Sequence, residues 1–368
     1  MPELTSISIH GFKSIASIDK LDLGPINVVI GPNGSGKSNF IGAFSLLQVY
    51  RDGRLADYVG AAGGANRLVH FGSKQTSQII VMARFEDQNS EYSLSLAVSA
   101  SDQLVLKSEH LHRIEAEEAD YVKMHVSMGG RQAMVTSTNS SKLDAHMETH
   151  IEKWRLYHFQ DTSSSSPMKK TADINDNRFL RPDGSNLAAF LYLLRVKHEA
   201  SYNLIRRSVQ LVAPFFDDFQ LEPLNLNPNT IKLEWRHKNT DSYFDASSFS
   251  DGTLRFIALA TLFLQPEELR PSVILVDEPE LGLHPYAITL LASLIKQASV
   301  KTQVIVSTQS PQLLDNFEPE DVIVADLVDG ATQLRRLDSE ELASWLEEYS
   351  LGELWEKNQF GGRPGALS

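Results

Sequence analysis

The stretch from Gly31 to Ser38 has the residue types and the spacing to hold phosphate groups. It matches the pattern G-x-x-x-x-G-K-[ST] of phosphate-binding loops. Glycines allow positive φ, so that backbone N–H groups converge on phosphate oxygens, while the lysine reaches the outer phosphates and the last hydroxyl reaches Mg²⁺. The sequence therefore predicts a site for a nucleoside triphosphate with Mg²⁺. The expected contacts are Asn33, Gly34, Ser35, Gly36, Lys37 and Ser38, the last also to the metal.

The elements around this loop are those that a phosphate site needs. Ile26–Ile30 is a β-branched run that predicts a buried strand, and Asn39–Leu47 has the pattern of a helix. The partial positive charge at a helix N-terminus favours a bound anion. A glycine-rich turn that binds nothing is the alternative, and the combination of strand, loop and helix disfavours it.

A second group of chemical residues follows another apolar run. Val273–Val276 predicts a central strand, and Asp277 and Glu278 come directly after it. At the tip of such a strand Asp277 would hold Mg²⁺ together with Ser38, and Glu278 would polarise the attacking water. A strand that ends in an ordinary polar turn is the alternative. Glu280, slightly further on, is interpreted as structural rather than catalytic.

A Ser-x-Gly turn precedes the acidic strand. Ser250 and Gly252 stand at the start of an apolar helix that runs through Ala260. Such a helix start presents N–H donors to an anion, although an ordinary helix cap would have the same residues. Leu281–Pro285 and Val304–Pro311 follow, the latter as a strand that ends in polar residues.

In this order the motifs resemble the SMC/RecF-like branch of ABC-type ATPases. The similarity is greatest to compact AAA-like ATPases related to the OLD family and to phage-defence ATPases. Two stretches are specific to that branch, namely Phe12–Ile15 and the Asp-Glu-Pro-Glu-x-Gly-Leu-His-Pro run that begins at Asp277. The resemblance covers residues 3 to about 330. It implies ATP as the nucleotide and hydrolysis as the reaction.

The resemblance also assigns roles. In such ATPases the signature Ser and Gly, here Ser250 and Gly252, bind the γ-phosphate held by the other subunit. Gln160 would be the glutamine that senses the metal, and Gln309 would occupy the switch position, with Gln309 and Glu278 as the catalytic residues. Relatives usually carry histidine at the switch. A glutamine can donate a hydrogen bond but does not titrate near pH 7. The signature also lacks a second glycine, having Asp251 instead.

Composition limits the partners and the compartment. The 368 residues carry a net charge of −13, so any DNA contact would use a local basic patch. Cysteine is absent from the sequence, which excludes disulfides and zinc–thiolate sites and fits a cytoplasmic location. No apolar run is long enough for a membrane span, and we expect no membrane association.

The predicted fold is α/β, a two-lobed ABC-type ATPase head with a mixed sheet, an antiparallel β-meander and a short helical arm. Alternation over residues 78–130 predicts the meander. Helical spacing over residues 185–212 predicts the arm, roughly 40 Å long if continuous. The expected domains are an N-terminal lobe at 1–170, the arm with connecting strands at 171–245, a C-terminal lobe at 246–335 and a helical tail at 336–364.

The resulting functional hypothesis is an ATPase that changes its own assembly. It would form a homodimer or a higher even-numbered oligomer and serve antiviral defence or DNA repair. Any nuclease, by resemblance one of the Toprim type, or another effector would be a separate subunit. A soluble ATPase subunit of a membrane transporter is an alternative, disfavoured by the Phe12–Ile15 opening. A nucleotide-dependent scaffold with negligible hydrolysis is another, favoured only by Gln309.

Overall fold

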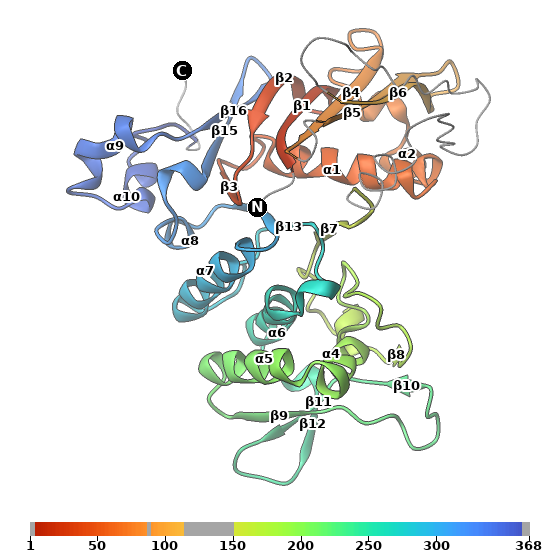
Figure 1. The fold of residues 1–368 in the computed structure, drawn as a ribbon, viewed down its shortest axis with the longest axis vertical. Coiled ribbons are helices and arrows are strands. Elements are labelled where there is room, and N and C mark those ends of the chain that lie inside the picture. Colours follow the sequence, from red (N-terminus) through yellow and green to blue (C-terminus); the bar gives the residue numbers. More distant parts are fainter. Residues whose placement is uncertain (1–3, 87–89, 114–150, 363–368) are drawn as a thin grey trace. The chain divides into compact units, whose positions relative to one another are not determined.

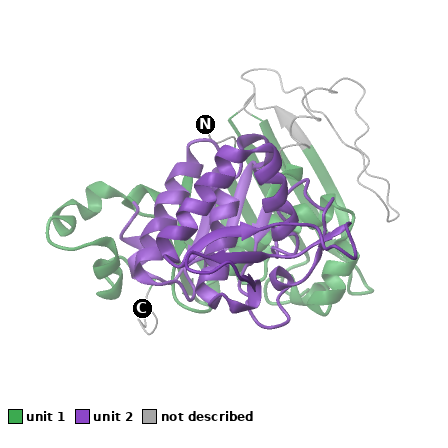
Figure 2. Cartoon of the chain, turned by 90° about the horizontal axis from the view of Figure 1, so that it is seen from below, with its two compact units in different colours: residues 1–154, 318–368 green, residues 155–317 purple. Residues whose placement is uncertain are grey.

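The computed structural model describes residues 4–86, 90–113 and 151–362. The chain forms two compact units, shown in different colours in Figure 2. Unit 1 comprises residues 1–154 and 318–368, and unit 2 comprises residues 155–317. The division into four segments expected from the sequence stays a prediction.

Unit 1 contains a five-stranded antiparallel sheet in the order β2-β1-β4-β5-β6 (Figure 1). The predicted meander is confirmed as β4, β5 and β6, and residues 114–130 lie outside the described residues. Along β4 the alternate residues Ile79, Val81, Ala83 and Phe85 are buried, as a strand with one face on the core requires. The strands are β1 (Leu4–Phe12), β2 (Ile15–Asp22), β4 (Gln78–Phe85), β5 (Ser90–Val98) and β6 (Leu104–Arg113).

The strand before the phosphate loop belongs to a separate group of strands in unit 1. All residues of β3 (Ile26–Ile30) are buried, and β3 pairs in parallel with β15 (Val322–Val328), with Val28 opposite Val322. An antiparallel hairpin joins β15 to β16. The remaining elements of unit 1 are β16 (Ala331–Arg336), α1 (Lys37–Arg51), α2 (Leu55–Ala62), α9 (Ser339–Leu346) and α10 (Leu351–Glu356).

Unit 2 holds the acidic strand. Its strands β13 and β14 run parallel, and the apolar helix α6 packs between α5 and α7. The short strand β7 (Trp154–Tyr157) crosses the boundary between the units. Apart from the arm and a small sheet, which are described next, the helices and strands of unit 2 include β8 (Ala172–Asp173), β10 (Thr230–Ile231), α6 (Asp251–Leu264), β13 (Val273–Asp277), α7 (Pro285–Ser299), β14 (Gln303–Thr308) and α8 (Pro311–Leu314).

The helical arm is interrupted. It consists of α4 (Leu187–Lys197) and α5 (Glu199–Val212), separated by His198, which has φ −136° and ψ 55°. The predicted arm therefore consists of two helices, and the length given for a continuous helix does not apply. A small antiparallel sheet in the order β12-β11-β9 follows the arm. Its strands are β9 (Phe216–Gln220), β11 (Glu234–His237) and β12 (Tyr243–Asp245).

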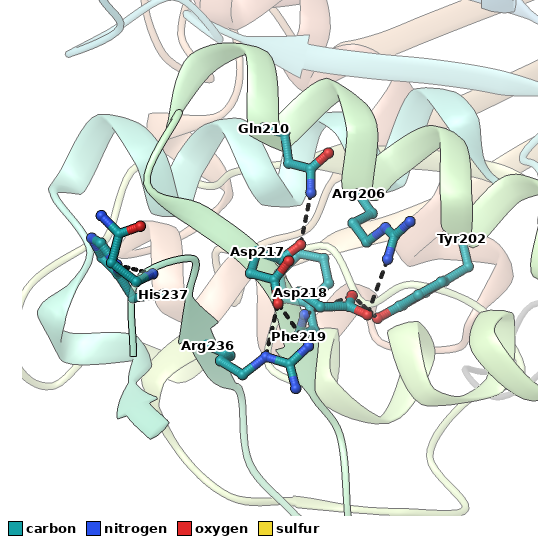
Figure 3. Close-up of polar contacts among 9 residues, drawn as sticks. Tyr202, Arg206, Gln210, Asp217, Asp218, Phe219, Arg236 and His237 are labelled. Carbon is teal, nitrogen blue, oxygen red and sulfur yellow. Dashed lines mark hydrogen bonds and ion pairs between the residues drawn. The ribbon is translucent and has the colours of Figure 1, made fainter. Parts of the chain in front are cut away.

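One aspartate joins the arm to this sheet, and the aspartate before it joins two strands of the sheet (Figure 3). Asp218 on β9 accepts hydrogen bonds from the Tyr202 hydroxyl at 2.7 Å and from Arg206 Nη1 at 3.3 Å, both on α5. The neighbouring Asp217 pairs with Arg236 of β11, whose Nε lies 2.8 Å from Asp217 Oδ2. Burial, reinforced by Asp218, raises the pKa of Tyr202, so the phenol stays a donor across the physiological range.

We expect Asp218→Ala to lower the free energy of unfolding by about 1–3 kcal/mol, because the Tyr202 hydroxyl loses its acceptor. The matched control is Asp217→Ala, which removes the pair with Arg236 and should cost clearly less. Urea titration followed by circular dichroism measures both. Equal losses for the two variants would contradict the role given to Asp218.

Candidate functional site

The phosphate loop joins the end of β3 to the start of α1. Gly34 has φ 82° and Gly36 has φ 100°, both in the left-handed region that favours glycine. A Cβ placed on Gly36 would lie 1.9 Å from Thr332 Oγ1, so a side chain is excluded there by space as well. Lys37 is buried and lies across the loop, with Nζ donating to the carbonyl of Gly31 at 2.7 Å.

The loop contains a polar atom suited to a ligand. The hydroxyl of Ser35 is shielded from solvent and makes no hydrogen bond among the described residues. An unsatisfied buried hydroxyl is costly unless a partner arrives. This hydroxyl, the glycines and the ammonium group of Lys37 fit a polyphosphate, which accepts hydrogen bonds at every oxygen.

Residues distant in sequence brace this loop within unit 1. The Thr332 hydroxyl donates to the Ser35 carbonyl at 2.9 Å and lies 2.7 Å from Ser14 Oγ. Asn39 on α1 donates to the same Ser14 hydroxyl at 2.7 Å. Sequence analysis had singled out the segment of Ser14, but Thr332 sits in an ordinary hairpin strand and carried no signal.

The acidic strand in unit 2 brings four predicted residues together. Asp277 ends β13 opposite Ser307 of β14, and the Ser307 hydroxyl donates to Asp277 Oδ1. Gln160 donates from Nε2 to the Asp277 carbonyl at 3.4 Å. The amide of Gln309 donates from Nε2 to Glu278 Oε1. Asp277, Gln160, Glu278 and Gln309 thus form one group at the ends of two parallel strands.

Glu278 has an unusual backbone conformation. Its φ is 47°, in the left-handed region where a non-glycine residue is disfavoured. The hydrogen bond from its N–H to the Ser307 carbonyl at 2.9 Å holds it there. Such strained residues persist only where the surrounding contacts hold them in place, and they are found most often at functional sites.

The signature turn starts α6. Ser250 caps the helix, its hydroxyl accepting from the Thr253 N–H at 3.1 Å. A Cβ on Gly252 would lie 2.3 Å from the carbonyl oxygen of Gly282, so the first turn of α6 packs directly on the segment after the acidic strand. The need for glycine at 252 therefore has a packing reason within the chain, in addition to the role that the resemblance implies.

Sequence analysis missed Arg255. This buried side chain on α6 donates from Nε to the Phe159 carbonyl at 3.0 Å and from Nη2 to the Gln160 carbonyl at 2.9 Å. It thereby ties the signature helix to the segment that carries Gln160. The available signal was a single charge in the apolar run from Thr253 to Leu264.

Of the predicted site residues, those of the phosphate loop lie in unit 1. Those of the acidic strand, the switch, the signature turn and Gln160 lie in unit 2. Each unit carries oxygen donors of the kind that Mg²⁺ prefers, namely the Ser38 hydroxyl in unit 1 and the Asp277 carboxylate with the Gln160 amide oxygen in unit 2. Hard oxygen ligands of this kind, few in number, suit Mg²⁺ shared with phosphate oxygens.

A family model described as "AAA domain, putative AbiEii toxin, Type IV TA system" matches residues 26–315. The chain belongs to this family. The matched range contains the phosphate loop, the signature turn, the acidic strand and the switch residue.

Solved structures give the fold of this AAA-family chain. An Smc head bound to the C-terminal winged-helix domain of ScpA has a TM-score of 0.60 at 19% identity, covering 93% of this chain and 100% of that one. The Smc head of Pyrococcus furiosus bound to the C-terminal domain of ScpA has a TM-score of 0.59 at 18% identity, covering 95% and 99%. These structures confirm the predicted mixed α/β fold of an SMC-like head, and the family match over residues 26–315 confirms the predicted likeness to AAA-like proteins.

A short curated match agrees with this class. Over 37 residues the chain is 65% identical to the chromosome partition protein Smc of Desulfitobacterium hafniense (strain Y51), a stretch that covers 10% of this chain and 3% of that protein. Among the described residues, no helix is both long and apolar enough to cross a membrane.

The packing of the signature turn can be tested directly. Gly252→Ala should lower the free energy of unfolding by about 1–3 kcal/mol, because the new methyl group collides with the Gly282 backbone. The control is Gly60→Ala in α2, where a Cβ meets open space and alanine should be neutral or stabilising by up to about 1 kcal/mol. Urea unfolding gives both values. A Gly252→Ala variant as stable as the wild type would contradict the close backbone contact.

Proposed function

We propose that the protein binds MgATP and hydrolyses it, and that ATP-dependent assembly of two copies controls a DNA-linked process. The observation that carries the proposal is the hydrogen bond from Gln309 to Glu278. Glu278 directly follows Asp277 at the end of β13, and Gln309 directly follows β14. A carboxylate held in a strained backbone conformation, with an amide donor on it, is suited to orient a water molecule beside a phosphate.

In this proposal each site residue has a role in binding or hydrolysing ATP. Lys37 and the N–H groups of the loop hold the β- and γ-phosphates, and the Ser35 hydroxyl gains a partner. Ser38, Asp277 and Gln160 would hold Mg²⁺, which neutralises charge on the phosphates. Glu278 would accept a hydrogen bond from the attacking water, and Gln309 would donate a hydrogen bond to the γ-phosphate. Phosphoryl transfer needs positioning and charge stabilisation rather than covalent chemistry, and these groups supply both.

A second copy would complete the site through its signature turn. Ser250 and the N-terminus of α6 offer donors to an anion, and the family resemblance assigns that anion as a γ-phosphate held by the other subunit. The proposed oligomer is therefore a homodimer or an even-numbered assembly. Loss of the γ-phosphate on hydrolysis would weaken the charge-assisted contact that joins the copies.

The biological role rests on the relatives. The family description names a putative toxin of a type IV toxin–antitoxin system, which supports a role in antiviral defence, and DNA repair is the related alternative. The Smc heads are described as bound to a domain of ScpA, which supports a separate protein partner here too. A Toprim-type nuclease is a candidate for that effector, and DNA would bind a local basic patch.

A nucleotide-dependent scaffold with negligible hydrolysis is the second candidate. It is favoured by Gln309, whose amide is engaged by Glu278 and cannot titrate near pH 7. Wild-type protein that binds ATP and releases no more phosphate than Glu278→Gln would establish the scaffold and overturn the ATPase.

Lys37→Ala should weaken MgATP binding at least tenfold. The variant loses charge-assisted contacts to the phosphates, each worth about 1.5–3 kcal/mol. Lys107→Ala is the control, because Lys107 is an exposed lysine of the same unit that pairs with Gln78. Calorimetric titration measures the affinities. Unchanged affinity in Lys37→Ala would show that the site is elsewhere.

Glu278→Gln should accumulate as dimers when ATP and Mg²⁺ are added, since binding geometry survives while water activation is lost. Adding Ser250→Arg should abolish the dimers without weakening ATP binding to the monomer. Ser250→Asp is a companion variant that keeps the helix cap but places a negative charge toward the phosphate, and it should also prevent assembly. Light scattering with and without ATP is the measurement. Assembly indifferent to nucleotide and to Ser250 would exclude the shared site.

A further inference from the structure

Glu280 has contacts that the proposed mechanism does not use. It follows Asp277 and Glu278 in unit 2, and its atom Oε2 is shielded from solvent with no hydrogen-bond partner among the described residues. Its other oxygen, Oε1, accepts from the Thr308 hydroxyl at 2.6 Å and from the backbone N–H of Gln309 at 3.2 Å. One carboxylate oxygen thus holds two consecutive residues at the end of β14.

Through Thr308, the hydrogen bonds of Glu280 reach one residue further, to Ser310. We call this set of hydrogen bonds from Glu280 to residues 308–310 the fastening. The Thr308 hydroxyl, while donating to Glu280, accepts from the backbone N–H of Ser310 at 2.9 Å. Ser310 in turn caps α8, with its hydroxyl accepting from the Leu313 N–H at 3.1 Å. The backbone on both sides of Gln309 is therefore tied, directly or through Thr308, to Glu280.

Gln309 is consequently held at two points by two acids of the same segment. Its side-chain amide donates to Glu278 and its backbone N–H donates to Glu280. A side chain whose backbone is fixed loses little freedom when it makes its functional contact, and small misplacements of such groups are costly to catalysis.

The pKa of the Glu280 carboxyl reflects its buried position. Burial is the main cause that raises the pKa of Glu280, and the charge of Glu278 adds to it, whereas the hydrogen bond from Thr308 acts in the opposite direction. The Oε1 atom accepts hydrogen bonds whether the carboxyl is ionised or neutral. Thr308 and Gln309 thus have an acceptor in either protonation state, and the hydrogen bonds are stronger when the carboxyl is ionised.

We propose that Glu280 is a positioning residue for ATP hydrolysis, acting on Gln309 through the backbone of the switch segment. The inference rests on the proposed ATPase function and deepens it, since it gives a role to a carboxyl group that the sequence had marked as structural. Glu280 touches neither nucleotide nor water. It acts by keeping the Gln309 amide on Glu278.

The test compares two substitutions. Glu280→Ala removes the acceptor and should lower kcat by about 10- to 100-fold with KM for ATP unchanged, because Lys37 and the loop are unaffected. Glu280→Gln keeps an acceptor oxygen of the same reach and should retain kcat within about threefold. A fall in kcat with Glu280→Gln as large as with Glu280→Ala would overturn the proposal, because the acceptor oxygen would then not be what matters.

A double-mutant cycle separates positioning from general damage. If Glu280 acts through Gln309, then Glu280→Ala combined with Gln309→Ala should be no slower than Gln309→Ala alone. Additive losses would overturn the proposal. Thr308→Val is the second route should Glu280→Ala fold poorly. It removes one donor to Glu280 and the acceptor for Ser310, and it should lower kcat severalfold with KM unchanged. Unchanged kcat in Thr308→Val would count against the fastening.

A measurement without nucleotide makes the outcome independent of turnover. Hydrogen–deuterium exchange at the Gln309 amide should accelerate in Glu280→Ala and stay at the wild-type rate in Glu280→Gln, because only the first variant loses the acceptor of this amide. Wild-type protein that hydrolyses no ATP would overturn the ATPase function itself, and the exchange rates would then decide the fastening alone. Unchanged exchange in Glu280→Ala overturns the fastening even if hydrolysis is present.

Discussion

The parallel pairing of β13 with β14 is the constraint on which the chemistry of unit 2 depends. Asp277 stands opposite Ser307 in this register, and the next residue along each strand adds Glu278 and Thr308. Because carboxyl ends of parallel strands meet at the same edge, the acids after β13 and the switch after β14 become neighbours. A shift of register by one residue would turn each side chain to the opposite face and separate these groups.

Polar fastenings beyond the motifs keep the motif residues in place. In unit 1, Thr332 and Ser14 brace the phosphate loop. In unit 2, Arg255 joins the signature helix to the segment of Gln160, and Glu280 holds the switch. Apart from the contact between the Ser14 and Thr332 hydroxyls, each of these hydrogen bonds ends on a backbone carbonyl or N–H group. Backbone groups are the natural anchor, since they position a residue without occupying the side chain that does the chemistry.

The same division between reacting groups and supporting contacts accommodates a glutamine at position 309. A glutamine offers a hydrogen-bond donor with no pH dependence. Its partner Glu278 has a strained backbone conformation, which the hydrogen bond from its N–H to the Ser307 carbonyl helps to hold. Control of such a site would then come from assembly and from the position of the switch rather than from titration. That view connects the proposed dimer with the role proposed for Glu280.

The sequence by itself predicted the phosphate loop and the acidic strand, because each is a local pattern. The order of these motifs along the chain predicted the fold class through the family resemblance. Glycine spacing, a buried apolar run and helical periodicity need no knowledge of distant residues. Only the tertiary structure decided that Thr332 meets the loop of Ser35, that the arm breaks at His198, and that Glu280 holds Gln309. Hydrogen bonds between residues far apart in the chain depend on strand order and register, and the residues that make them carry no local signature.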